Sequence, residues 1–164
     1  MRKTLGLQGA RVSRLELKIP PDVVWVIVAG LMWLASTVTP KLALPSAARV
    51  AAGATLTILG IFAMASARAA LAQANTTWRP TTPTNATRLV TSGIYRVSRN
   101  PVYLGMMLVL VGLAVLLASP AALLVSAVFV LYLDLYQIAP EERALAEAFG
   151  QEYVEYRARV RRWI

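Results

Sequence analysis

Four apolar runs dominate the sequence, and polar or proline-containing segments separate them. Each run is close to the roughly 17 residues that an α-helix needs to cross the hydrocarbon of a bilayer. The nearby prolines stand at the edges of the runs, where the first turn of a helix tolerates a missing N–H. The pattern therefore predicts four transmembrane helices, over residues 23–38, 50–67, 102–118 and 121–138.

A different pattern begins after Pro140, where charged residues alternate with apolar ones. Pro140 suits the first position of a helix, and Glu141 and Glu142 would interact favourably with its positive end. Apolar and aromatic residues then recur every three or four positions, as on one helix face, at Leu145, Phe149, Tyr153, Tyr156 and Val160. Residues 140–164 are predicted to form an amphipathic helix, which packs on the spans or simply lies on lipid headgroups.

The basic residues predict how the spans are oriented. Five precede the first run, two lie in the first connection, five in the second, none in the third and five after the last run. By the positive-inside rule, both termini and the long second connection are predicted to be cytoplasmic. The expected fold is all-α, a single integral membrane domain over 1–164, made of a cytoplasmic tail, a helical hairpin, a cytoplasmic loop, a second hairpin and the amphipathic helix, at 1–22, 23–70, 71–100, 101–138 and 140–164.

Composition supports the membrane assignment and narrows the chemistry. Hydrophobic residues make up 57% of the 164 positions and the mean hydropathy is +0.57, both high for a soluble domain. The 17 Lys and Arg residues give a net charge of +9, but they fall between the apolar runs, which favours topogenic loops over nucleic-acid binding. Since the sequence has no Cys and no His, it offers no thiolate, no disulfide, no zinc site of the usual kind and no imidazole base. No metal is expected.

The second connection, residues 71–100, is polar and rich in Thr, Asn and Pro. A loop of this length in a compact protein is usually functional or disordered. Its two N-glycosylation sequons, at Asn75 and Asn85, are expected to stay unmodified on a cytoplasmic face.

A first cluster of candidate functional residues leads from this connection into the third run. Its members are Gly93, Tyr95, Arg96, Arg99, Asn100, Pro101, Tyr103 and Gly105. Asn100 is placed to cap the third helix, with Pro101 in its first turn. The two arginines could serve only as interfacial anchors. Those structural roles do not account for two tyrosines and two glycines at one membrane depth, so a functional role is favoured.

A second cluster follows the fourth run. It comprises Glu141, Glu142, Phe149, Gly150, Tyr153, Tyr156, Arg157 and Arg159. Paired carboxylates at a membrane surface are often only the solvated start of a helix, but this helix must pack its apolar face on something. Asp134, about one turn inside the fourth run, is costly to place in a membrane, so it is either functional or paired with a nearby Arg.

Together the two clusters resemble the isoprenylcysteine carboxyl methyltransferase family in its small bacterial form. The resemblance covers residues 88–164 and rests on the order and spacing of Tyr95-Arg96, Arg99-Asn100-Pro101, Tyr103, Gly105, Glu141-Glu142, Phe149-Gly150, Tyr153, Tyr156 and Arg159-Val160. That family and the related phospholipid N-methyltransferases are membrane enzymes that use S-adenosylmethionine. The resemblance thus implies this cofactor and, for a bacterial form, the inner membrane.

The resemblance also implies a cytoplasmic cofactor pocket, walled by the third and fourth helices and closed by the C-terminal helix. The implied catalytic residues are Arg99, Glu142 and Arg159. The implied cofactor-binding residues are Tyr95, Asn100, Pro101, Tyr103 and Gly105 on one wall, the acids Glu141 and Glu142, and Tyr153 and Tyr156 on the closing helix.

Two positions depart from the family pattern. Asn100 stands where members commonly carry His, and an amide can both donate and accept, so it remains compatible with cofactor binding. The segment 137–140 reads Gln-Ile-Ala-Pro, where members often place an Arg before the glutamate pair. If that Arg holds a substrate carboxylate in the family, the acceptor of this chain is left open.

The residue types suit methyl transfer from a zwitterionic sulfonium donor. Such a site needs an acid for the ammonium, donors for the carboxylate and an aromatic slot for adenine. The predicted function is methyl transfer to a lipophilic acceptor from the bilayer. The resemblance favours an isoprenylcysteine-like carboxylate, which needs no base when it is ionised. An amine acceptor, as in phospholipid N-methylation, would need Glu141, Glu142 or Asp134 to take a proton.

A non-catalytic alternative also stays open. The chain would then be a membrane module whose basic faces bind anionic lipid or a partner helix. In either case the expected partners are membrane lipids or a lipophilic acceptor, without nucleic acid. Small residues in the spans, such as Gly105 and Gly112, permit close helix packing within or between chains.

Overall fold

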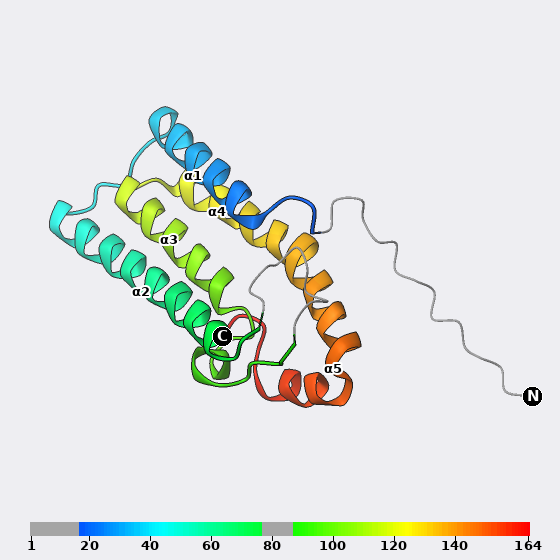
Figure 1. Ribbon diagram of the computed structural model, residues 1–164. Coiled ribbons are helices and arrows are strands. Elements are labelled where there is room, and N and C mark those ends of the chain that lie inside the picture. Colours follow the sequence, from blue (N-terminus) through cyan, green and yellow to red (C-terminus); the bar gives the residue numbers. More distant parts are fainter. Residues whose placement is uncertain (1–16, 77–86) are drawn as a thin grey trace, which may run out of the picture.

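The computed structural model describes residues 17–76 and 87–164, and every regular element within these two ranges is helical (Figure 1). The elements are α1 Pro21–Val38, α2 Ser46–Gln73, the 3-10 turn η2 Gly93–Arg96, α3 Pro101–Leu117, α4 Pro120–Leu133, the π-helical η3 Asp134–Ile138 and α5 Ala139–Arg159. By length and composition, α1, α2 and the continuous helix that begins with α4 can cross a membrane, and α3 is apolar but shorter, with 17 residues. The all-helical fold is confirmed, and its helices are apolar enough to suit a membrane protein, whereas the count of four spans stays a prediction.

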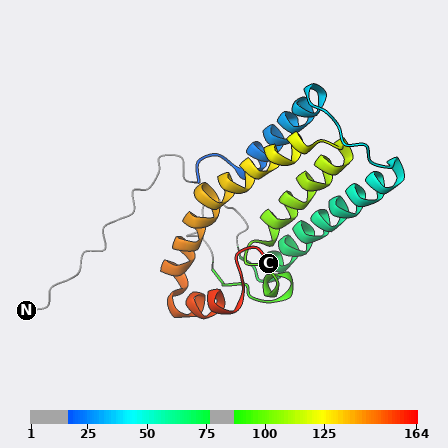
Figure 2. The same cartoon turned by 180° about the vertical axis from the view of Figure 1, so that it is seen from behind.

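The helices alternate in direction, and α3 lies at the centre. It contacts α2 on one side and α4 on the other, while α1 packs mainly on α4 (Figures 1 and 2). At one end of the bundle the two short connections meet, where Leu42 N donates to Ala118 O at 2.8 Å. The other end gathers the starts of α1 and α3, the end of α2 and all of α5.

Helices α2 and α3 cross through glycines. A Cβ atom added to Gly60 would lie 2.6 Å from Gly105 O, and one added to Gly105 would lie 2.5 Å from Gly60 O. Two helical turns further along α3, a Cβ atom added to Gly112 would lie 2.8 Å from Gly53 O. The expectation of close packing at Gly105 and Gly112 is confirmed, and their partner is α2 of the same chain.

The fourth helix continues past Pro140, whereas the sequence predicted a separate helix that starts there. Helix α4 passes through η3 directly into α5. Proline blocks the hydrogen bond to the carbonyl four residues earlier, which here is Tyr136 O. Leu17 N donates to that oxygen instead, at 3.1 Å. A π-helical turn and an outside donor therefore let the helix continue through the proline.

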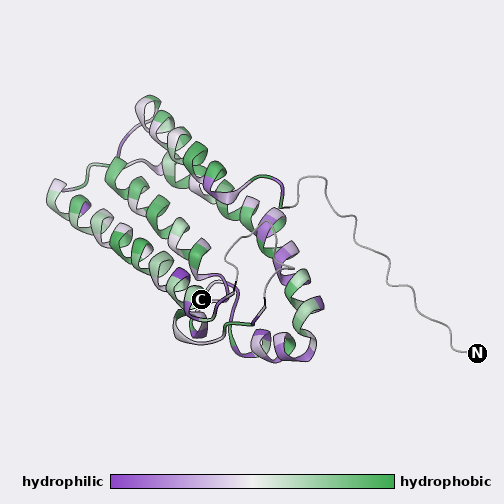
Figure 3. Cartoon of the chain, viewed as in Figure 1, coloured by the Kyte–Doolittle hydropathy of each residue, from purple (hydrophilic) through white to green (hydrophobic). Residues whose placement is uncertain are grey.

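The predicted single amphipathic helix over 140–164 is also wrong. Gly150 has φ 49° and ψ −121°, which breaks α5 into two pieces that point in different directions (Figure 1). A positive φ of this kind favours glycine. Beyond Arg159 the chain becomes extended at Val160. Figure 3 shows that hydrophilic residues are concentrated in α5 and the segments near it, while α1 to α4 are hydrophobic over most of their length.

Candidate active site

A cavity of about 160 Å³ lies at the polar end of the bundle. The starts of α1 and α3, the end of α2, the segment that precedes α3, and α5 line it. Among the described residues α4 contributes nothing to the lining, so the pocket expected between the third and fourth helices instead involves α1, α2, α3 and α5. This arrangement follows from the central position of α3, whose first turn faces both α2 and α5.

Most of the predicted site residues meet in this cavity. Its lining includes Tyr95, Arg99, Asn100, Pro101, Tyr103, Glu141, Tyr153 and Tyr156. The structure places Gly105, Glu142 and Arg159 elsewhere. Gly105 faces α2 at the glycine crossing, Glu142 lies behind Arg99, and Arg159 lines a separate recess.

Two acids line the cavity, Asp22 at the start of α1 and Glu141 on α5. Tyr103 Oη donates a hydrogen bond to the Glu141 carboxylate. Glu141 belongs to α5, past the apolar part of the helix. Desolvation and the neighbouring Glu142 raise the pKa of Glu141 to about 8, although the bond from Tyr103 favours the charged form. A cation bound beside this carboxylate would favour its ionised form further.

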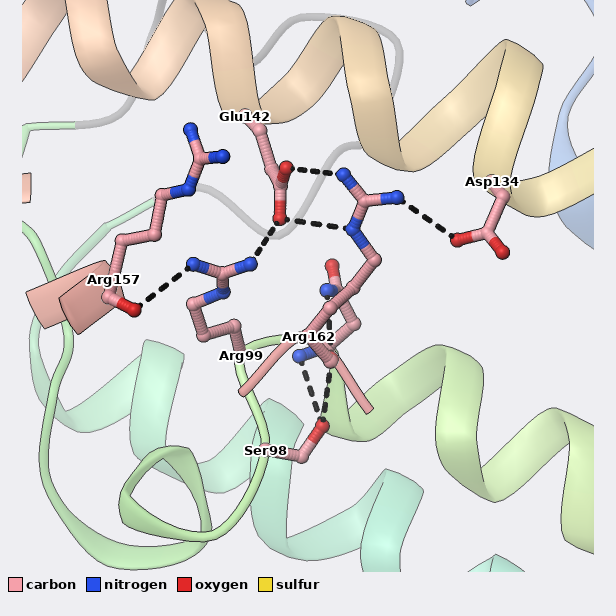
Figure 4. Close-up of polar contacts among 7 residues, drawn as sticks. Ser98, Arg99, Asp134, Glu142, Arg157 and Arg162 are labelled. Atoms are coloured by element: carbon pink, nitrogen blue, oxygen red, sulfur yellow. Dashed lines mark hydrogen bonds and ion pairs between the residues drawn. The ribbon is translucent and has the colours of Figure 1, made fainter. Parts of the chain in front are cut away.

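Glu142 has a different environment, between two guanidinium groups (Figure 4). Its Oε1 accepts from Arg99 Nη2 at 2.8 Å, and its Oε2 accepts from Arg162 Nη2 at 2.6 Å. Arg162 Nη1 also reaches Asp134 Oδ1 at 3.3 Å. Asp134 thus forms the ion pair that was one of its two predicted roles, and the Glu142 carboxylate is already engaged.

Arg99 connects this network to the cavity. Its side chain is only 8% exposed, and it donates to Glu142 and, at 3.4 Å, to Arg157 O (Figure 4). Its Nε–H has no hydrogen-bond partner among residues 17–76 and 87–164. Because a buried donor without a partner costs free energy, this N–H is suited to an oxygen acceptor on a bound ligand.

Residues 160–164 pack against the segment that leads into α3. Arg162 O accepts from Asn100 Nδ2 at 3.0 Å and from Ser98 Oγ at 3.3 Å, and Arg161 O accepts from Arg99 N at 3.1 Å. Asn100 is the N-cap residue of α3, but its side chain makes no capping hydrogen bond. Asn100 thus stands at the predicted N-cap position, but its side-chain amide binds residue 162 instead of the helix.

The tyrosines form the aromatic part of the lining. Tyr156 Oη donates to Tyr95 O at 2.7 Å, and the rings of Tyr153 and Tyr156 meet edge to face with centroids 6.3 Å apart. Burial raises the pKa of Tyr95, so its phenol stays neutral. These rings provide an apolar surface with polar edges.

Sequence reasoning missed Arg162. It stands in a run of basic residues that indicated topology only, and no spacing rule brings position 162 next to position 142. A search for partners of the buried acids Glu142 and Asp134 could have named an Arg, but not this one.

Comparison with known proteins identifies the family. The family model described as phospholipid methyltransferase matches residues 48–152. The chain belongs to this family. Protein-S-isoprenylcysteine O-methyltransferase B of Arabidopsis thaliana is 40% identical over 73 residues, which are 44% of this chain and 37% of that protein. The Saccharomyces cerevisiae protein-S-isoprenylcysteine O-methyltransferase is also 40% identical over 73 residues, 44% of this chain and 30% of that protein. An uncharacterized protein of Haemophilus influenzae is 39% identical over 62 residues, 38% of this chain and 98% of its own length.

These matches confirm the resemblance to membrane methyltransferases. The chain spans only about a third of the length of the plant and yeast relatives it matches. The matched family region includes α3 and the glutamate pair, but Tyr153, Tyr156, Arg159 and Arg162 lie beyond it.

Proposed function

We propose that this chain is an S-adenosylmethionine-dependent methyltransferase that transfers a methyl group to a lipophilic acceptor, preferentially a carboxylate. Family membership and the names of the plant and yeast relatives support the reaction class. The observation that carries the proposal is one cavity lined by an acid, Glu141, and by the buried guanidinium of Arg99, whose Nε–H has no partner in the part of the chain that the structure describes. A cavity with one carboxyl group and one guanidinium group in its lining suits a zwitterionic ligand, which carries both charges.

The cavity residues fit the methyl donor group by group. Glu141 would hold the ammonium, and Arg99 Nε–H would donate to the carboxylate. The rings of Tyr95, Tyr153 and Tyr156 supply a surface for adenine. Bound there, S-adenosylmethionine would supply an electrophilic methyl group to the nucleophile of the acceptor. Glu142 supports this arrangement indirectly, because it holds Arg99 in place.

The acceptor would enter against the apolar part of the lining. Leu71, Val102 and Met106 from α2 and α3 face the cavity beside the polar groups. A carboxylate acceptor is ionised at neutral pH and needs no base, which suits a chain without histidine. The preference for a carboxylate rests on this argument and on the names of the relatives.

Phospholipid or amine N-methylation is the second candidate. The description of the family favours it. An ammonium acceptor must lose a proton before it attacks, so this reaction would need a carboxylate other than the one that holds the methyl donor to take that proton. The two reactions can be separated by supplying each class of acceptor. A methyl ester among the products indicates carboxyl methylation, and a methylated headgroup indicates N-methylation.

The proposed setting is a bacterial inner membrane, crossed four times, with both termini and the cavity on the cytoplasmic side. The alternating helix directions and the distribution of basic residues support this orientation. Lipophilic acceptors would then reach the cavity from the bilayer.

The test is a calorimetric titration of S-adenosylmethionine and S-adenosylhomocysteine into the purified full chain in detergent. We expect saturable binding by wild type, and Glu141→Gln to weaken it by about tenfold, since a charge-assisted hydrogen bond is lost. Glu147→Gln, on the exposed side of the same helix, is the matched control and should bind as wild type does. No binding by folded wild type, in detergent and in nanodiscs alike, would contradict the proposal and favour the non-catalytic module.

A further inference from the structure

A second recess, of about 430 Å³, adjoins the cavity and shares Tyr156 with it. Its lining comprises Thr91, Ser92, Arg96, Tyr156, Arg159 and Val160. The two arginines come from η2 and from the end of α5, so the fold brings together two positive charges that are far apart in the sequence. Neither the family region nor the cavity chemistry accounts for this pairing.

The recess has the chemistry of an anion site. No acidic residue lines it, and neither Arg96 nor Arg159 forms an ion pair with any residue in the described ranges. The Nε of Arg159 donates only to Glu155 O of its own helix, at 3.3 Å. The hydroxyl of Ser92 does not cap η2. Two arginines and two hydroxyl-bearing residues therefore line one recess, and no acidic residue is among its described lining.

The surroundings of the recess indicate what kind of anion it holds. It lies at the polar end of the molecule, between the segment that contains η2 and the end of α5. Val97, which is 58% exposed, follows Arg96 directly, and Val160 is part of the lining. In the proposed orientation this end of the molecule is on the cytoplasmic side of the membrane, where the anions of the bilayer surface are phosphates attached to acyl chains.

We propose that this recess binds the phosphate group of an anionic membrane lipid. Guanidinium groups match phosphate oxygens with two parallel hydrogen bonds each, and the Thr91 and Ser92 hydroxyls add further donors. The exposed valine beside the site lies against the lipid chains. Binding at this recess requires membrane insertion but no methyl donor. The lipid-site proposal can therefore be tested independently of the methyltransferase proposal.

The experiment uses the purified full chain in detergent micelles that contain equal amounts of phosphatidylglycerol and phosphatidylcholine. Native mass spectrometry then counts the lipid that stays bound. We expect wild type to retain phosphatidylglycerol preferentially and Arg96→Gln/Arg159→Gln to lose that preference by at least about tenfold, given two basic contacts at an anionic headgroup. Arg157→Gln/Arg161→Gln is the matched control, because it removes the same charge from residues that do not line the recess.

The outcomes are separable. Retention by Arg96→Gln/Arg159→Gln at the wild-type level, or an equal loss in both double variants, would overturn the site, since the latter means attraction by bulk charge. Displacement of phosphatidylglycerol by millimolar inorganic phosphate would assign the recess to a free phosphate and overturn the lipid as its occupant. Thermal unfolding checks that each variant is folded, and the single variants Arg96→Gln and Arg159→Gln, each with a partial loss, replace the double variant if it does not fold.

Discussion

The crossing of α2 and α3 and the polar end of the molecule around Glu142 are stabilised in different ways. At the crossing, backbone meets backbone, because Gly60 and Gly105 leave no side chain between the helices. At the polar end, charged side chains from the segment before α3, from η3, from α5 and from residues 160–164 bind one another. The first region is sensitive to volume and the second to charge.

This difference matters because the cavity lies between the two regions. The crossing sets the position of the first turn of α3, which carries Pro101 and Tyr103. The polar end sets the position of Arg99 and of the glutamate pair. A ligand that touches both walls depends on both kinds of packing, which substitutions can separate.

The largest expected effect is at the crossing. Gly105→Ala would place a Cβ atom 2.5 Å from Gly60 O, so the helices must move apart. We expect a loss of about 3 kcal/mol in the free energy of unfolding, the upper end of ordinary overpacking. Thermal unfolding in detergent measures it. Gly30→Ala in α1 is the control, because nothing lies within 4 Å of its added Cβ atom, and it should be neutral or slightly stabilising. Equal stability of the two variants would show that the crossing is not this close.

The next effect is at Glu142. Glu142→Gln leaves the guanidinium groups of Arg99 and Arg162 without their shared carboxylate. Breaking a buried ion pair typically costs about 3–5 kcal/mol, and we expect about 2 kcal/mol here because Arg162 is 35% exposed. Binding of S-adenosylhomocysteine should weaken as well, because Arg99 loses its support. Glu152→Gln, at an exposed position of α5, should change neither quantity. Unchanged stability in Glu142→Gln would mean that the network is dispensable.

The same contrast explains what sequence reasoning could reach. The length of an apolar run is a local signal, so the apolar runs located α1, α3 and α4 to within a few residues. The run over 50–67 missed the end of α2, which extends to Gln73 because its last turns are less apolar but still helical. Ion pairing at the polar end is not local. The partnership of Glu142 with Arg162 depends on the direction in which the chain leaves Gly150, and the positive φ of that glycine has no signature in the spacing of apolar residues.

The glutamate pair shows this limit most directly. The residues are adjacent in sequence, and both were predicted near the cofactor. In the structure Glu141 lines the cavity beside Tyr103, whereas Glu142 points to the two arginines. Adjacent positions on a helix differ by about 100° in direction, so only the placement of α5 decides which acid meets a ligand.

Glu141 gives a prediction that sharpens this distinction. With its pKa raised to about 8, the unliganded carboxyl group is mostly protonated at pH 7. A bound cation favours the ionised form, so binding of S-adenosylmethionine at pH 7 should release nearly one proton, and the release should fall toward zero as the pH rises above the pKa. Calorimetry in buffers with different ionisation enthalpies measures this number. Glu141→Gln should release none, and the same release from that variant would assign the proton to another group.

The smallest expected effect is at Asp134, on the outer side of the same network. Its oxygen lies 3.3 Å from Arg162 Nη1, and the two side chains are 30% and 35% exposed. Solvent screens such a pair, so Asp134→Asn should lower the free energy of unfolding by less than about 1 kcal/mol, well below the cost of Glu142→Gln. Thermal unfolding of the two variants side by side tests the ranking. A loss in Asp134→Asn as large as that in Glu142→Gln would show that Arg162 depends on both acids equally, and the polar end would then act as a single unit that joins η3 to the cavity.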